Sequence, residues 1–195
     1  MASFKIHLAI AKKYIEKHNN ITNEKDFYLG SIAPDLPSDK APLHFTTFTG
    51  TEDLIRSLLE KVDINKACQN IIPDTDYNKG ILLHLITDYM FYTKFFDMDY
   101  VKSVSYSDYH RDLYYSYDIT DEYIKNKYNL DLPFIDEVTN KKLSTFKKKT
   151  KYDSNTAKDI IPIDKLEKFI LTLVTIVANV KILLKNLQKK LPRRC

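Results

Sequence analysis

Residues 81–91 read Ile81-Leu82-Leu83-His84-Leu85-Ile86-Thr87-Asp88-Tyr89-Met90-Phe91. The apolar residues in this run predict a helix that is largely buried. Residues four positions apart lie on the same face of an α-helix, so His84 and Asp88 should point the same way. A buried aspartate is unfavourable unless it is paired, hydrogen-bonded or bound to a cation. Because zinc accepts both an imidazole nitrogen and a carboxylate oxygen, this pair is a candidate metal site.

The composition of the chain is that of a globular protein. Its 195 residues suggest one domain spanning 1–195, and 44% of them are hydrophobic. The chain has only 3 glycines, which argues against an all-β sandwich and against a glycine-rich phosphate loop. The net charge of +4 is too small to indicate nucleic-acid binding by itself.

Helical periodicity recurs along the chain, and strand-like alternation is absent. We therefore predict an all-α, single-domain bundle of about six or seven helices. We expect helices over 4–17, 26–33, 64–71, 78–96 and 107–128, a helix from Leu54 to Val62 capped by Thr51 or Asp53, and a long final helix from Asp159 or Asp164 to about Lys190. The polar, lysine-rich residues 140–158 are expected to form a flexible loop.

The two ends of the chain bear on its location. Residues 1–7 contain neither an apolar h-region nor a small-residue cleavage site, so we predict a cytoplasmic protein. The longest uncharged apolar run, residues 169–180, is shorter than the about 20 residues that a membrane-spanning helix needs. We expect the final helix to pack in the bundle. The alternative is a peripheral membrane contact, with basic residues facing anionic head groups. Those basic residues are Lys185, Lys189, Lys190, Arg193 and Arg194.

Three further residues could join His84 and Asp88. His7 lies on the inward side of the first predicted helix, Asp35 follows a proline at a helix end, and His44 lies nine residues later. The candidate metal ligands are thus His7, Asp35, His44, His84 and Asp88. No thiolate is among them, which favours a catalytic site over a closed structural zinc site.

Each of these residues also has a structural interpretation without metal. A histidine such as His7 on an apolar helix face is often a hydrogen-bonded core residue, and Asp35 could cap a turn. His44 could be a surface loop residue, and His84 could form a buried hydrogen bond with Asp88. Taken together, these interpretations require three of the five histidines to gather with two aspartates by chance.

Four segments resemble a known family. They are residues 6–11, residues 27–36, His44-Phe45 and residues 83–89. They look like the zinc-dependent phospholipase C family, whose superfamily also holds single-strand nucleases. The resemblance covers roughly residues 1–95. Its most specific part is the run Gly30-Ser31-Ile32-Ala33-Pro34-Asp35 combined with the His-x-x-x-Asp run of residues 84–88.

The resemblance implies an all-helical fold with a metal cluster in a cleft. One zinc would be held by Asp35, His44, His84 and Asp88. Asp88 would bridge to a second zinc that is also held by His7. The expected cofactor is therefore one or two zinc ions.

The chain departs from the secreted members of that family at two points. Their amino-terminal tryptophan, which binds metal, has no counterpart, because the chain contains no tryptophan and six residues precede His7. Their third zinc site is also incomplete. His110 is a candidate for a further metal ligand, but Tyr114 stands four residues after it where the family has an acid.

The expected function is a zinc-dependent phosphodiester hydrolase, phospholipase C-like, acting on a substrate such as a phospholipid. Zinc would activate a water molecule, and Asp35 is the candidate proton acceptor. One alternative is a non-catalytic metal- or lipid-binding helical module. Another is a nuclease of the same superfamily, which the modest charge disfavours although abundant tyrosines could stack bases.

Overall fold

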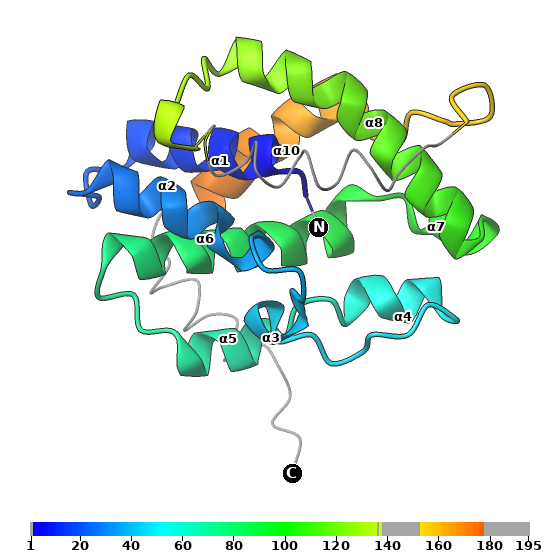
Figure 1. Ribbon diagram of the computed structural model, residues 1–195, viewed down its shortest axis with the longest axis horizontal. Helices are drawn as coiled ribbons and strands as arrows, with labels where there is room; N and C mark the ends of the chain where they lie inside the picture. Colours follow the sequence, from blue (N-terminus) through cyan, green and yellow to red (C-terminus); the bar gives the residue numbers. More distant parts are fainter. Residues whose placement is uncertain (1, 136, 138–152, 178–195) are drawn as a thin grey trace.

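The computed structural model describes residues 2–135, 137 and 153–177, and all the regular structure in these ranges is helical (Figure 1). The elements are α1 (Phe4–Lys17), α2 (Glu24–Ile32), η1 (Ala33–Asp35), α3 (Ala41–His44), α4 (Leu54–Leu59), α5 (Ile64–Asn70), α6 (Asp76–Met90), η2 (Phe91–Phe95), α7 (Met98–Ser103), α8 (Tyr106–Lys127) and α10 (Ile163–Ile176). The prediction of an all-α fold is confirmed for these residues. The finer assignment to the phospholipase C type stays a prediction.

Side-chain caps explain where several helices begin. The Ser3 hydroxyl accepts a hydrogen bond from the backbone N–H of Ile6 at the start of α1, and Asp53 does the same for Arg56 at the start of α4. Such caps satisfy N–H groups that have no partner inside the helix. The N-cap of α4 is therefore Asp53 and not Thr51.

The structure differs from the predicted boundaries in several places, among them the helix predicted for residues 54–62, which ends at Leu59 as α4. The short helix α3, which ends at His44, was not predicted. The expected helix 78–96 begins two residues earlier, at Asp76, and changes to a π-helical turn, η2, after Met90. Helix α7 was not predicted. Helices as short as α3 and α7 depend on tertiary contacts for their stability, so periodicity alone gives little signal for them.

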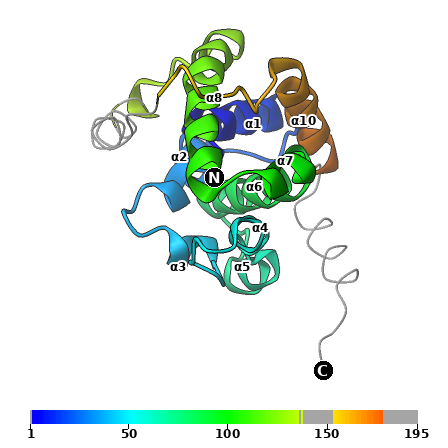
Figure 2. The same cartoon turned by 90° about the vertical axis from the view of Figure 1, so that its right-hand side faces the viewer.

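Helix α6 lies in the middle of the molecule. Helices α1, α8 and α10 lie on one side of it, and α3, α4 and α5 lie on the other (Figures 1 and 2). The described buried apolar side chains form one cluster that takes residues from both sides. This central place explains why residues 82–88 of α6 are all buried.

Two glycines let α2 and α6 come into close contact. A Cβ on Gly30 would lie 2.0 Å from the Tyr77 carbonyl oxygen, and one on Gly80 would lie 2.3 Å from the Phe27 carbonyl oxygen. Neither position has room for a side chain. The approach brings the backbone of Ser31 in α2 next to the His84 side chain in α6.

Some expectations fall on residues that the structure does not describe. Most of the expected loop 140–158 and the end of the final helix near Lys190 lie outside the described residues, as do the basic residues proposed to face a membrane. The described part of the final helix, α10, buries Leu166, Ile170, Leu173 and Val174. Within the described ranges, every helix is too short or too polar to cross a bilayer.

Candidate metal centre

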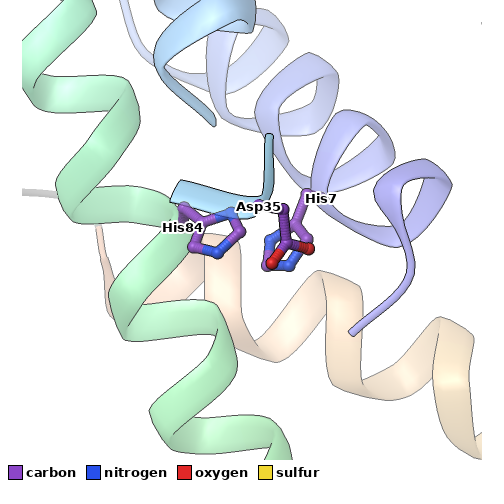
Figure 3. Close-up of side chains that lie close together, drawn as sticks. All are labelled: His7, Asp35 and His84. Carbon is purple, nitrogen blue, oxygen red and sulfur yellow. The ribbon is translucent and has the colours of Figure 1, made fainter. Parts of the chain in front are cut away.

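The structure brings the five candidate ligands together at the centre of the molecule. All five are buried: His7, Asp35, His44, His84 and Asp88. They come from α1, η1, α3 and α6, and Figure 3 shows three of them converging from separate elements. Their ligand atoms form two overlapping groups, each with all atoms within 4.8 Å of one another. This arrangement could hold a metal ion.

Backbone carbonyl groups fix the orientation of two of the histidines. The Nδ1 atom of His44 lies 2.8 Å from the Lys40 carbonyl oxygen, and the Nδ1 atom of His84 lies 2.8 Å from the Ser31 carbonyl oxygen. A carbonyl oxygen only accepts hydrogen bonds, so each Nδ1 must carry the hydrogen. In the neutral rings, both Nε2 atoms therefore present lone pairs. Outer partners of this kind commonly orient metal-binding histidines.

Those two Nε2 atoms lie only 3.0 Å apart. Two lone pairs at this distance repel each other unless a proton or a cation lies between the nitrogens. Burial, together with the nearby His7, lowers the pKa of His84 to about 3, which disfavours a proton there at neutral pH. A metal cation satisfies both nitrogens without protonating either ring.

The distances between neighbouring ligand atoms match those around a tetrahedral zinc ion. Ligands bound at 2.0–2.2 Å in a tetrahedron lie about 3.3–3.6 Å from one another. The His44 Nε2 atom lies 3.3 Å from Asp88 Oδ2 and 3.6 Å from Asp35 Oδ1. The His84 Nε2 atom lies 3.6 Å from Asp88 Oδ2. His44 Nε2, His84 Nε2 and Asp88 Oδ2 lie within 4.8 Å of one another and could belong to one ligand shell, and Asp35 Oδ1 lies next to His44 at its edge.

His7 lies beside this shell in a different orientation. Its ring stacks on that of His84, with centroids 3.8 Å apart and an angle of 13° between the planes. A ring nitrogen binds a metal in the plane of its own ring, so one ion cannot lie in both of these nearly parallel planes. The ligand atoms of His7 and His84 are close enough to belong to one metal site. Their lone pairs lie in different, nearly parallel planes, however, so the two rings cannot bind the same ion. The arrangement is thus compatible with two separate cation positions.

Asp88 faces both positions. Its Oδ2 atom is the one that approaches His44 and His84, whereas its Oδ1 atom lies 3.4 Å from His7 Nε2. The backbone N–H of Ala2 also donates to Oδ1 at 2.8 Å and holds the carboxylate in place. A carboxylate with one oxygen toward each position can bridge two ions.

Several buried polar atoms at the site have no hydrogen-bond partner among the described residues. They are both ring nitrogens of His7 and the Oδ2 atom of Asp88. The His7 Nε2 atom lies 3.4 Å from the other carboxylate oxygen of Asp88, Oδ1, but forms no hydrogen bond with it. Buried polar atoms in native proteins are almost always paired. Metal bonds to His7 Nε2 and Asp88 Oδ2 would account for two of these three atoms.

Asp35 is paired with a lysine that sequence reasoning did not single out. The Lys40 ammonium lies 2.8 Å from Asp35 Oδ1. Burial raises the pKa of Asp35, but the charges of His84, when protonated, and of Lys40 outweigh it, and the pKa falls below its usual value. At neutral pH, Lys40 is the charge that persists. Nothing in the sequence pattern marks Lys40, because lysines are common in polar loops.

His110, the candidate further ligand, belongs to neither group of ligand atoms in the described residues. Its ring lies on α8 between Tyr106 and Tyr114, with centroid distances of 4.3 and 5.8 Å. Burial lowers its pKa to about 4. His110 is therefore uncharged at neutral pH.

Comparison of the chain with protein-family models, with curated proteins and with solved structures found no match.

Proposed function

We propose that this protein is a zinc-dependent phosphodiester hydrolase of the phospholipase C type. The observation that carries the proposal is the 3.0 Å approach of two acceptor nitrogens, His44 Nε2 and His84 Nε2, beside the buried carboxylates of Asp35 and Asp88. Nitrogen and oxygen ligands without thiolates, at tetrahedral spacing, suit a catalytic zinc.

The ligand set fits two zinc ions. Asp35, His44, His84 and Asp88 would hold the first, and His7 with the other oxygen of Asp88 would hold the second. When bound, zinc would supply an activated water and would polarise a phosphoryl oxygen.

The chain itself supports this chemistry in two ways. The Ser31 and Lys40 carbonyl groups hold His84 and His44 in the tautomer that leaves Nε2 free. The Lys40 ammonium favours the ionised form of Asp35, because it lies within hydrogen-bond distance of that carboxylate. An ionised Asp35 can act as a metal ligand and can accept a proton from water at neutral pH.

Turnover by the zinc-loaded protein tests the proposal. The substrates are a short-chain phosphatidylcholine, a single-stranded oligonucleotide and bis(p-nitrophenyl) phosphate. We expect turnover of at least one of them, and His84→Ala should lower kcat/KM by at least about a hundredfold, the scale of losing an electrostatic catalytic contact. The matched control is His18→Ala, because His18 lies at the opposite end of α1 from His7.

Absence of turnover by a protein that binds zinc would instead support the non-catalytic metal-binding module. Equal rates for wild type and His84→Ala would also contradict the proposal.

The stacked rings make a separate prediction about stoichiometry. His7→Ala should lower the bound zinc from two ions per chain to one, because only the second position uses His7. Elemental analysis of dialysed protein measures the ratio, with His18→Ala again as the control. An unchanged ratio in His7→Ala would contradict the two-position arrangement.

A further inference from the structure

Residues 2 and 3 connect three helices beside the candidate metal centre. The backbone N–H of Ala2 donates to Asp88 Oδ1 on α6 at 2.8 Å. The Ser3 carbonyl oxygen accepts the backbone N–H of His7 on α1 at 3.1 Å. The Ser3 hydroxyl donates at 2.5 Å to Asp121 Oδ1 on α8, the helix that packs against α1 (Figures 1 and 2). Two adjacent residues therefore bond to both members of the second cation position and to a carboxylate outside it.

The second position has fewer supporting hydrogen bonds than the first. The Nδ1 atoms of His44 and His84 each lie within hydrogen-bond distance of a backbone carbonyl oxygen. Both ring nitrogens of His7, in contrast, have no hydrogen-bond partner among the described residues. The oxygen of Asp88 nearest to His7, Oδ1, accepts its hydrogen bond from Ala2. The placement of Ala2 therefore helps to fix the carboxylate oxygen of the second position.

The Ser3 hydroxyl is held from two sides. It donates to Asp121, and it accepts the backbone N–H of Ile6 at 3.3 Å as the N-cap of α1. A hydroxyl has one hydrogen to donate, and Asp121 takes it. Burial raises the pKa of Asp121 to about 6, although the bond from Ser3 and the charge of Lys5 oppose this rise. At pH 7.5 the carboxylate is therefore largely ionised, and an ionised acceptor forms a stronger hydrogen bond than a neutral one.

We propose that Asp121 is a positioning residue for the second zinc ion. Its acceptor oxygen anchors Ser3 to α8, and the adjoining Ala2 then holds Asp88 Oδ1 toward His7. Asp121 acts through this chain of hydrogen bonds and is not itself a metal ligand. The inference rests on the proposed function, since the second ion belongs to that site.

Zinc titration monitored by calorimetry at pH 7.5 tests the proposal. Asp121→Ala should weaken binding of the second ion about tenfold, the lower end of the range for outer-shell partners of metal ligands. Binding of the first ion should change much less, because that ion keeps Asp35, His44 and His84. Asp121→Asn should restore the wild-type affinity, because its amide oxygen can still accept the Ser3 hydroxyl hydrogen. An Asn variant as weak as the Ala variant would assign the effect to the lost charge and overturn the proposal.

Ser3→Gly removes the same hydrogen bond from its other end. Glycine is tolerated at an N-cap far better than alanine, so α1 should still form in this variant. The affinity for the second ion should fall as it does in Asp121→Ala. The double variant should bind zinc like either single variant, because both changes remove one shared interaction. Additive losses in the double variant would contradict a pathway through Ser3.

Asp118→Ala is the matched control. Asp118 is exposed on α8, three residues before Asp121, and its substitution changes the net charge by the same amount. This variant should bind both ions as the wild type does. Equal affinities for the second ion in Asp121→Ala and Asp118→Ala would overturn the proposal. Equal weakening of both ions in Asp121→Ala would also overturn it, because a general loss of structure has that effect.

The wild-type titration separates failure of this inference from failure of the proposed function. A wild type that binds no zinc overturns the proposed function and this inference together. A wild type that binds a single ion overturns the two-position arrangement and, with it, this inference. Two bound ions in the wild type, with unchanged affinities in Asp121→Ala, overturn this inference alone.

Discussion

Replacing Asp88 with alanine should remove both of the proposed zinc ions at once. The two oxygens of Asp88 face different histidines, Oδ1 toward His7 and Oδ2 toward His44 and His84. Even outer-shell changes typically lower metal affinity 10- to 100-fold, so loss of a ligand shared by both positions should lower it at least about a hundredfold for each ion. Elemental analysis and zinc titration monitored by calorimetry would measure the loss.

A second buried aspartate on the same helix provides the control. Asp76 accepts hydrogen bonds from the backbone N–H groups of Thr22 and Asn23, at 2.8 and 2.7 Å, and pairs with Lys79. Asp76→Ala should cost roughly 2–3 kcal/mol of stability because it leaves these donors unpaired, yet it should retain zinc. If both variants keep their zinc, or both lose it, Asp88 has no specific role as a bridge.

The metal-free protein should lose stability steeply as the pH falls below about 6.5. The pKa of His84 is about 3 in the folded chain, mainly through burial, against a usual value of 6.5. Between these two values the unfolded chain takes up a proton that the folded chain does not. The free energy of unfolding therefore falls as the pH falls, by about 1.4 kcal/mol per pH unit for this one group.

The two carboxylates act in the same direction at lower pH. The pKa values of Asp35 and Asp88 lie below the usual 3.8, because contacts with basic groups outweigh the effect of burial. Their stabilising contribution is present above the unfolded pKa and is lost as the pH falls through the folded one.

Urea unfolding of chelator-treated protein from pH 7.5 to 4.5 would measure the slope. At pH 7.5, zinc at a thousand times its Kd should add about 4 kcal/mol for each site. This gain should shrink in acid, because protons compete for the ligands. A stability that stays flat from pH 7 to 5 in the metal-free protein would contradict the buried, neutral state of His84.

Much of the local structure followed from short-range signals. The helix over residues 4–17 and the shared face of His84 and Asp88 depend only on spacing and caps, and both are present in the structure. The sequence also marked all five residues that gather at the candidate metal centre. Their chemical types are rare among apolar neighbours, and this contrast is visible without any coordinates.

The features that sequence reasoning missed depend on neighbours distant along the chain. The close approach of α2 and α6 requires Gly30 and Gly80 together, since a Cβ at either one would clash with the backbone of the other helix. The Lys40 ammonium group differs from those of other lysines only in what lies beside it, the carboxylate of Asp35. No local pattern distinguishes a lysine that borders a buried carboxylate from one on a solvated face.

The sequence by itself determined the helical class of this protein and the identity of its candidate ligands, because periodicity and residue chemistry are properties of the chain. Only the tertiary structure decided how those ligands face one another. Three features depend on orientation. His7 stacks on His84, the Nε2 atoms of His44 and His84 lie 3.0 Å apart, and the two oxygens of Asp88 lie next to different histidines. Orientation is set by the packing of α1, α3 and α6 against one another, and no single segment contains that information.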